Sequence, residues 1–467
     1  MKKRWFVLLC ASLLSATLFV ILTACGAHGT GDGSSEGELA YTLSEDGESY
    51  TVTGVGTAKG KHVTIASEYN GKPVTAIGRG AFQNTFFRSV TIPDSVTRIE
   101  DAAFSYAQGL RFIIIPESVT EIGENAFYNA YRLCSVIIYG DVARIEKGTF
   151  ARCGVLASVT LFGEVESIEA EAFMFCSRLA SVVLPESVTS IGSGAFNGCK
   201  NLAWLALPES VTSIGSGAFN RCENLAWLAL PAGITRIERG AFSECVKLAE
   251  ITIPQGVTSI GERAFYGCEG LTSLVIPESV RQIEKNAFER CGGLASLTLS
   301  EGVTSIGERA FAECTSLASL HIPATLTSVN TEGPESSFLS CQGLASITVA
   351  EGNAVYHSAG NCLIETEGKT LVLGCKNSVI PRGGSVTELG SYAFYGCRDL
   401  TSINIPADVA FIGDRVFYGC KNLTAIHFNW YIVHWDDSFK LTHWDEGTGD
   451  YTIYCVDGTI EKKSQNK

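Results

Sequence analysis

The sequence is poor in charged residues, and its charge is mainly negative. Asp, Glu, Lys and Arg together make up only 18% of the 467 residues, whereas 46% are hydrophobic. This composition excludes a long disordered chain, which needs few hydrophobic and many charged residues. Acidic residues outnumber basic ones by 49 to 35, and there is no long basic run. We therefore expect no binding to nucleic acid or to anionic lipid headgroups.

The sequence also lacks common signatures of catalysis. Its one G-x-S-x-G match, 33–37, lies in the predicted tether and not between a predicted strand and helix, so it is no nucleophile elbow. The glycine-rich stretch 29–33 precedes no predicted helix, which excludes a phosphate-binding loop. Histidine occurs only seven times. The duplicated His-Trp-Asp triplets, 434–436 and 443–445, suggest a metal site or a hydrolase. Aromatic side chains that anchor polar loops are the alternative, and we expect no enzyme activity, no metal and no cofactor.

The first 25 residues have the organisation of a secretory signal. Three basic residues, 2–4, precede an almost wholly apolar stretch, 5–22. An uncleaved membrane anchor is the alternative, since this stretch is barely long enough to span a bilayer. The sequence Leu22-Thr23-Ala24-Cys25 resembles a bacterial lipobox. That resemblance implies cleavage before Cys25, acylation of Cys25, and an extracellular protein held to the cell envelope through its N-terminal lipid alone.

A phenylalanine recurs along most of the chain. From Phe104 to Phe311 the step is 23 residues every time, and a fixed step of this size is the signature of a solenoid. The recurring residues are Phe82, Phe104, Phe127, Phe150, Phe173, Phe196, Phe219, Phe242, Phe265, Phe288, Phe311, Phe338, Phe394 and Phe417.

Each repeat contains one clear strand. In one repeat, Leu205 and Leu207 alternate with Trp204 and Ala206, which is the periodicity of a strand with two inward side chains. Pro208 ends this strand because proline has no amide donor for the ladder. Because every turn repeats the one before it, strands of successive turns must pair in parallel.

The rest of the repeat closes the coil. Val188 and Ile191 supply a second pair of inward side chains, and Gly192 permits a tight turn. We expect a short helical turn to begin at Ala195 and to bury Phe196. No single turn can bury its apolar edge alone, so neighbouring turns stabilise one another.

The repeat I-P-x-S-V-T-x-I-G-x-x-A-F-x-x-C-x-x-L-x-x-L resembles the BspA type of leucine-rich repeat found in bacterial surface proteins, over roughly 73–428. The resemblance implies a right-handed, β-dominated solenoid with one parallel sheet along one face and β-rich caps at both ends. It also implies adhesion to matrix proteins, host cells or other bacteria. The predicted segments are a signal peptide (1–24), a tether (25–37), an N-terminal β cap (38–70), repeats (71–348), a β-hairpin insertion (349–381), repeats (382–428) and a C-terminal cap and tail (429–467).

Cysteine also follows the repeat. Eleven cysteines lie three residues after a repeat phenylalanine, at 153, 176, 199, 222, 245, 268, 291, 314, 341, 397 and 420. Such wide spacing does not fit a C-x-x-C metal site. Stacked turns could bring adjacent cysteines within disulfide range. However, Ala107 and Ala130 occupy the same position in earlier repeats, so we expect small, buried, free thiols.

The outward face of the parallel sheet is the candidate binding surface. Small hydroxyl residues dominate it, and against that background Trp204 and Trp227 occupy equivalent positions in adjacent repeats. The alternative is that the two indoles stack only for stability. The candidate ligand-binding residues are Phe112, Ile114, Trp204, Trp227, Glu250 and His321.

Three functions compete at this point. The anchor and the long sheet indicate a surface protein that binds a protein partner or extracellular matrix. The two tryptophans suggest a glycan-binding envelope protein, because sugar rings stack on indoles. The histidines near the C-terminus suggest a hydrolase, which we consider the weakest alternative.

Overall fold

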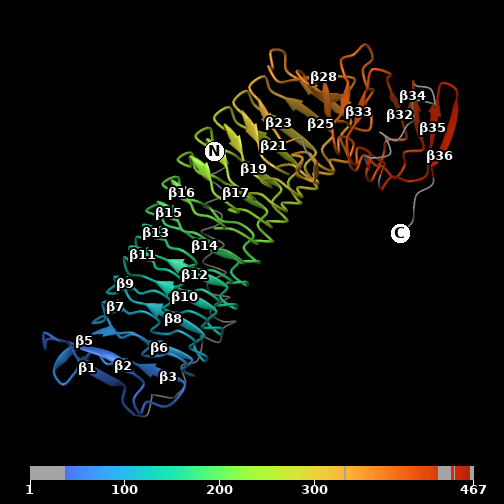
Figure 1. Ribbon diagram of the computed structural model, residues 1–467. Helices are drawn as coiled ribbons and strands as arrows, with labels where there is room; N and C mark the ends of the chain where they lie inside the picture. The colour runs from blue at the N-terminus through green and yellow to red at the C-terminus, as the bar shows by residue number, and fades with distance from the viewer. Residues whose placement is uncertain (1–36, 331–332, 430–442, 446, 463–467) are drawn as a thin grey trace. The chain divides into compact units, whose positions relative to one another are not determined.

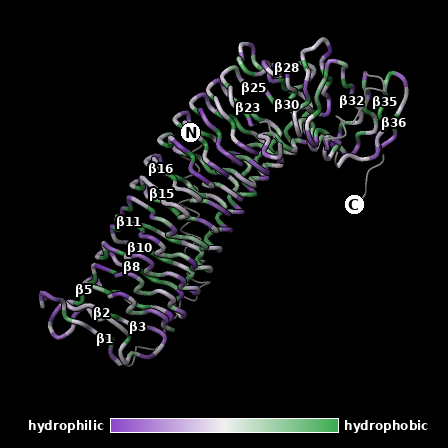
Figure 2. Tube along the Cα trace, viewed as in Figure 1, coloured by the Kyte–Doolittle hydropathy of each residue, from purple (hydrophilic) through white to green (hydrophobic). Residues whose placement is uncertain are grey.

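The computed structural model describes residues 37–330, 333–429, 443–445 and 447–462. The chain divides into two compact units, residues 1–225 and 226–467, and each is described by itself. Within each unit, hydrophobic residues recur turn after turn along the coil (Figures 1 and 2). The predicted signal peptide, Cys25 and nearly all of the predicted tether lie outside the described residues.

Unit 1 is a stack of turns with two parallel ladders. The ladder that carries the longer strands is called the long-strand face, and it includes a four-stranded sheet in the order β14-β12-β10-β8 (Figure 1). Its strands, with β3 and β6 before them, are β3 (His62–Thr64), β6 (Ser89–Thr91), β8 (Phe112–Ile115), β10 (Ser135–Ile138), β12 (Ser158–Leu161) and β14 (Ser181–Val183). The parallel pairing predicted from the repeat is confirmed.

A second ladder of two-residue strands, called the short-strand face, runs along unit 1. The sequence predicted inward side chains here but no second sheet. Its strands are β7 (Arg98–Ile99), β9 (Glu121–Ile122), β11 (Arg144–Ile145), β13 (Ser167–Ile168), β15 (Ser190–Ile191) and β16 (Ser213–Ile214). It continues a β-rich start that comprises β1 (Ala40–Leu43), β2 (Tyr50–Gly54), β4 (Glu68–Tyr69) and β5 (Lys72–Ile77).

Unit 2 repeats the same two faces and then departs from them. Its long-strand face comprises β17 (Trp227–Ala229), β19 (Glu250–Thr252), β21 (Ser273–Ile276), β23 (Ser296–Leu299), β25 (Ser319–Ile322), β27 (Ser346–Val349), β32 (Ser402–Ile405) and β34 (Ala425–Phe428). Its short-strand face comprises β18 (Arg236–Ile237), β20 (Ser259–Ile260), β22 (Gln282–Ile283), β24 (Ser305–Ile306), β26 (Ser328–Val329), β31 (Glu388–Leu389) and β33 (Phe411–Ile412).

Antiparallel strands interrupt unit 2 in two places. Within the predicted insertion, β28 (Tyr356–Ala359), β29 (Cys362–Glu365) and β30 (Thr370–Leu373) form two hairpins, and β30 then pairs in parallel with β31. Near the C-terminus, β35 (Tyr451–Cys455) pairs in parallel with β34 and antiparallel with β36 (Gly458–Lys462). The boundaries of the insertion and of the caps stay predictions, as does the right-handed coil.

The repeat phenylalanines fill the interior of each unit as a stack of parallel rings. Phe104 and Phe127 are both fully buried, their ring centroids lie 5.0 Å apart, and their planes differ by 1°. The pair Phe265 and Phe288 has the same separation in unit 2, with a 6° angle. Each turn therefore adds one ring to a continuous apolar core, which explains why the phenylalanine spacing is so strict.

The predicted helical turn at Ala195 and Phe196 is wrong. The only helix among the described residues is the short 3-10 helix η1 (Gly333–Glu335). Around Phe196 some backbone amides donate to the next turn of the solenoid and others donate within their own turn. Phe196 N donates to Ala218 O of the next turn at 2.8 Å, whereas Cys199 N donates locally to Phe196 O at 3.1 Å. Gly198, two residues after Phe196, has a φ of +74°, and a left-handed residue at this point stops a right-handed helix from continuing.

Candidate functional site: the long-strand face and a pocket in unit 2

The outward side chains of the four-stranded sheet in unit 1 form aligned columns. Ile137 on β10 lies beside Ile114 on β8 and beside Thr160 on β12, which in turn lies beside Val183 on β14. Parallel register places such partners on the same face. Ile114 and Val183 are 46% and 39% exposed, and Phe112 is half-buried. Phe112 and Ile114 therefore lie on a partly exposed apolar surface of this sheet, and whether they bind a ligand stays a prediction.

The two most exposed aromatic rings on this face are Tyr139 and Phe162. They follow the last residues of β10 and β12, and their amides continue the ladder to Ile115 O and Ile138 O at 3.0 and 2.8 Å. Alternation along the strand places both side chains outward. Their ring centroids lie 5.0 Å apart with planes only 6° apart, although the side chains are 46% and 60% exposed.

The sequence contains a signal for this pair that the repeat analysis missed. The repeat position that Tyr139 and Phe162 occupy is proline in the flanking turns, Pro116 and Pro185. Proline ends a strand because it lacks an amide hydrogen. Tyr139 and Phe162 replace it in two consecutive turns, keep the ladder bond, and add a large ring. We name Ile114, Tyr139, Phe162 and Val183 together the apolar strip.

Carboxylates border the apolar strip. Asp141 and Glu164 each lie two residues after an aromatic ring of the pair, and both are exposed. Asp141 Oδ1 accepts a hydrogen bond from Glu164 N at 2.9 Å, so these two turns hold each other in place. Glu117 and Glu186 follow the flanking prolines and are also exposed. The rim of the strip is therefore acidic.

One prediction for this face is wrong at β10. Residues between inward pairs were expected to face solvent, yet Ser135 and Ile137 are only 2% and 5% exposed. Ser158 on β12 is also buried and its hydroxyl donates to Ser135 Oγ at 3.3 Å. The apolar strip therefore belongs to the exposed part of this face, whereas the outward side chains of β10 do not.

The two candidate tryptophans belong to different units. Trp204 in unit 1 is half-buried, and its segment is not part of a described strand. Trp227 on β17 of unit 2 is 44% exposed and lies in register with Glu250 on β19, which is also exposed. Whether these tryptophans bind a ligand stays a prediction.

His321 does not join Trp227 and Glu250. It lies on β25, beside Thr348 of β27, and its Nδ1 is 2.9 Å from Thr348 Oγ1. Strands β21 and β23 lie between β19 and β25, so three strand spacings, roughly 14 Å, separate His321 from Glu250. These two candidate residues therefore do not form one compact site.

The cysteine ladder is buried, as predicted. Cys153, Cys176 and Cys199 are fully buried free thiols. Each donates its Sγ–H to the carbonyl of the phenylalanine one turn earlier, as Cys153 does to Phe127 O at 3.1 Å. Burial raises the pKa of the Cys153 thiol to about 12. A protonated, enclosed thiol is a poor nucleophile and a poor metal ligand, so the ladder serves packing.

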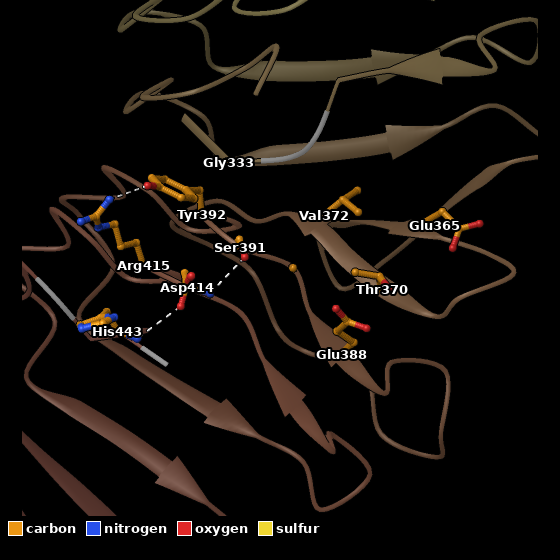
Figure 3. A pocket seen from close by; sticks show the side chains of 11 residues that line it. Gly333, Glu365, Thr370, Val372, Glu388, Ser391, Tyr392, Asp414, Arg415 and His443 are labelled. Carbon is orange, nitrogen blue, oxygen red and sulfur yellow. Dashed lines mark hydrogen bonds between the residues drawn. The ribbon is translucent and has the colours of Figure 1, made fainter. Parts of the chain in front are cut away.

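Unit 2 contains a pocket of about 700 Å³ on its short-strand face (Figure 3). The strands β30 and β31 form one wall, which carries Thr370 and Glu388, and Glu365 stands beside them. The opposite wall consists of loop residues that follow β31 and β33, together with His443 of the next turn. The loop residues that line it are Ser391, Tyr392, Asp414, Arg415 and His443. Sequence reasoning missed this pocket.

The second His-Trp-Asp triplet has a structural role. Trp444 is only 2% exposed, and its ring packs edge-on against Phe417 with centroids 6.0 Å apart. Asp445 Oδ2 accepts a hydrogen bond from Tyr451 OH at 2.5 Å, and burial with this carboxylate raises the pKa of Tyr451. These contacts favour the alternative in which aromatic residues anchor loops. The first triplet, including His434, lies outside the described residues.

Among the residues that the structure describes, no group of three or more His, Cys, Asp or Glu side chains is arranged to hold a metal ion. Nor do these residues include a helix of the length and apolar character needed to cross a membrane. The expectations that the protein uses no metal and no cofactor stay predictions.

Stacked parallel turns with inward leucine, isoleucine and phenylalanine define a leucine-rich-repeat solenoid. The chain belongs to the BspA type of leucine-rich repeat proteins, because residues 75–203, 166–291, 235–362 and 373–440 match the family's BspA type leucine-rich repeat region. The matched residues make up more than half of the chain. Membership in this family indicates a role in protein interaction.

One solved structure supports the same fold, and a second is similar in sequence. A leucine-rich repeat protein from Bacteroides ovatus is 25% identical, with a TM-score of 0.64, and the match covers 90% of this chain and 99% of that one. A leucine-rich cell surface protein from Faecalibacterium prausnitzii is 26% identical, with a TM-score of 0.44, covering 87% of this chain and 98% of that one. None of the curated proteins matches the chain.

Proposed function

We propose that this protein is a bacterial surface protein that binds a protein partner, such as an extracellular matrix component, through the long-strand face of unit 1. The observation that carries the proposal is the exposed ring stack of Tyr139 and Phe162. The lipobox-like sequence before Cys25 supports an anchored, extracellular location. A lipid on Cys25 would hold the protein at the envelope while the repeats extend to the partner.

The energetics of the apolar strip suit a binding surface. The part of each ring that is left in water gains hydrophobic free energy only when a partner covers it. Burying one aromatic side chain contributes about 1.5–3 kcal/mol, and aromatic residues dominate the binding energy of protein interfaces. Because the ladder amides of Tyr139 and Phe162 fix the backbone, little ordering cost remains when a partner arrives.

The border of the strip defines the chemistry of the partner. Asp141, Glu164 and Glu186 surround the rings with negative charge. A partner with apolar side chains flanked by lysine or arginine matches this pattern, whereas an acidic partner is repelled. We therefore expect association to slow as salt is raised, because rim charges act mainly on the association rate.

The test uses the chain from Gly26 to Lys467, which retains every described residue, on a panel of extracellular matrix proteins. The Tyr139→Ala/Phe162→Ala variant is expected to bind at least tenfold more weakly than the wild type, since two anchoring rings are lost. Phe86→Ala is the matched control, because Phe86 is 74% exposed in unit 1 but lies outside the strip. Equal binding by wild type and the double variant would place the interface elsewhere.

Glycan binding at Trp227 is a second candidate function. The indole is 44% exposed on β17, with the small side chain of Ala229 two residues further on. An accessible indole beside a small residue can stack against a sugar ring. Soluble glycans that compete with the partner, and a Trp227→Ala variant that no longer responds to them, would favour this function over protein binding. We expect no catalytic activity in either case.

A further inference from the structure

The pocket on the short-strand face of unit 2 has a wall that the repeats do not have. Cross-strand register places Glu365 beside Thr370, and Thr370 beside Glu388. Register partners share a face, so carboxylate, hydroxyl and carboxylate stand in a row that is roughly 10 Å long, or two strand spacings. Val372, which lies on the same strand as Thr370, adds an apolar surface to the pocket.

The carboxylate of Glu388 has no hydrogen-bond or ion-pair partner among the described residues. Two other acidic side chains on the repeats of unit 2 are paired with arginine: Glu284 with Arg236 at 3.0 Å, and Glu289 with Arg309 at 2.6 Å. The carboxylate of Glu365 accepts hydrogen bonds from the amides of Glu367, at 3.1 Å, and Gly368, at 2.6 Å. Of the two acidic side chains in the row, Glu388 is thus the one that faces the pocket with its full accepting capacity.

The opposite wall supplies an aromatic ring and hydrogen-bond donors (Figure 3). Arg415 Nη1 donates to Tyr392 OH at 2.9 Å, which fixes the ring and the guanidinium together. Asp414 Oδ1 accepts from His443 N at 3.3 Å, and Asp414 N donates to Ser391 Oγ at 3.0 Å. These bonds connect loops of three different turns, so this wall is already formed before a ligand arrives.

The charge and the hydrogen-bonding groups of the lining narrow the class of ligand. The lining carries three carboxylates, Glu365, Glu388 and Asp414, and one guanidinium, Arg415, and backbone amides already donate to Glu365 and Asp414. The three carboxylates repel a strongly anionic ligand. A polyol is not repelled, and each of its hydroxyls can donate to a carboxylate or accept from the guanidinium.

We propose that this pocket binds a short neutral oligosaccharide. Its hydroxyls bond to Glu388, Thr370 and Arg415, and one ring packs against the aromatic face of Tyr392. The volume of about 700 Å³ lies in the range of ligand sites in proteins. This site is separate from the apolar strip of unit 1, so either one can fail without the other.

The experiment measures binding of four neutral trisaccharides, cellotriose, maltotriose, mannotriose and chitotriose, by titration calorimetry on the chain from Gly26 to Lys467. At least one is expected to bind with a Kd of about 1 mM or tighter. Glu388→Gln is expected to weaken that binding at least tenfold, because a charged acceptor becomes a neutral amide. It leaves the fold intact, since no described residue depends on this carboxylate.

The matched control is Glu351→Gln, which removes an exposed carboxylate before β28 that does not line the pocket, and it should leave sugar binding unchanged. Spermidine serves as a cationic probe. The proposal is overturned if none of the four sugars binds, if Glu388→Gln binds a sugar as tightly as the wild type does, or if spermidine binds and is released by added salt. Loss of sugar binding in Tyr392→Ala, with retained thermal stability, would support the assigned wall.

Discussion

The chain contains two kinds of aromatic stack with almost the same geometry. Phe104 and Phe127 inside unit 1 have ring centroids 5.0 Å apart and planes 1° apart, and Tyr139 and Phe162 on its long-strand face have 5.0 Å and 6°. The first pair is fully buried, whereas the second is 46% and 60% exposed. Identical spacing follows in both cases from the distance between successive turns.

This difference shows that ring stacking in a solenoid does not by itself distinguish a structural residue from a binding residue. Any residue type that repeats once per turn will stack, whether it stabilises the fold or waits for a partner. Exposure separates the two cases, because a buried ring has already gained its hydrophobic free energy and an exposed ring has not. The predictions below test that separation, beginning with the buried rings.

Phe173→Ala should cause the largest effect. Phe173 is fully buried and stacks on Phe150 at 5.4 Å and on Phe196 at 5.2 Å, so its removal leaves a cavity between two rings. We expect the free energy of unfolding to fall by about 3–5 kcal/mol. Urea denaturation followed by circular dichroism measures it. A loss below about 1 kcal/mol would show that the core refills the space and that the buried stack is not the main support of the turns.

The buried thiols beneath the rings should make the protein sensitive to alkali. Burial raises the pKa of Cys153, Cys291 and Cys341 to about 12, from an ordinary value of 9.0. A folded-state pKa that is raised gives stability that is complete below the unfolded value and is lost as pH rises towards the folded value. Between about pH 9 and pH 12, each thiol should therefore cost about 1.4 kcal/mol per pH unit.

Alanine variants isolate this thiol effect from the titration of lysine and tyrosine. Ala107 and Ala130 occupy the same repeat position, so alanine fits there. The triple variant Cys153→Ala/Cys291→Ala/Cys341→Ala should lose stability less steeply than the wild type when urea titrations at about pH 8 and about pH 10.5 are compared. Parallel slopes for the two proteins would mean that the thiols do not titrate in this range.

Much of the fold could be predicted from the sequence because each repeat position occurs many times, so its apolar or polar character is seen in many turns. Inward residues such as Val159 and Ile191, and the buried Cys176, recur with the period and are buried as expected. The turn after the phenylalanine was predicted as helical because its local spacing allows one. The left-handed residues that prevent a helix include Arg152 and Phe175, and neither residue type signals a positive φ.

The candidate sites were less predictable for different reasons. Tyr139 and Phe162 break the proline pattern, so the sequence does contain their signal, but only as a departure from the repeat. The pocket depends on the register of Glu365, Thr370 and Glu388, which the lengths of two irregular loops determine. Periodicity carries no information about such loops, so the sequence alone did not indicate that these three residues lie side by side.

The smallest expected effect on stability is the sharpest test of the comparison. The Tyr139→Ala/Phe162→Ala variant should lose less stability than Phe173→Ala in the same urea titration, because the pair contributes at most about 1.5 kcal/mol beyond its burial and both rings are only partly buried. The strand ladder survives, because it uses the amides of these two residues rather than their rings. A loss as large as that of Phe173→Ala would make the exposed pair a structural clamp. The proposed interface would then lose its main support, since weakened partner binding by the variant would simply report unfolding of the turns that carry it.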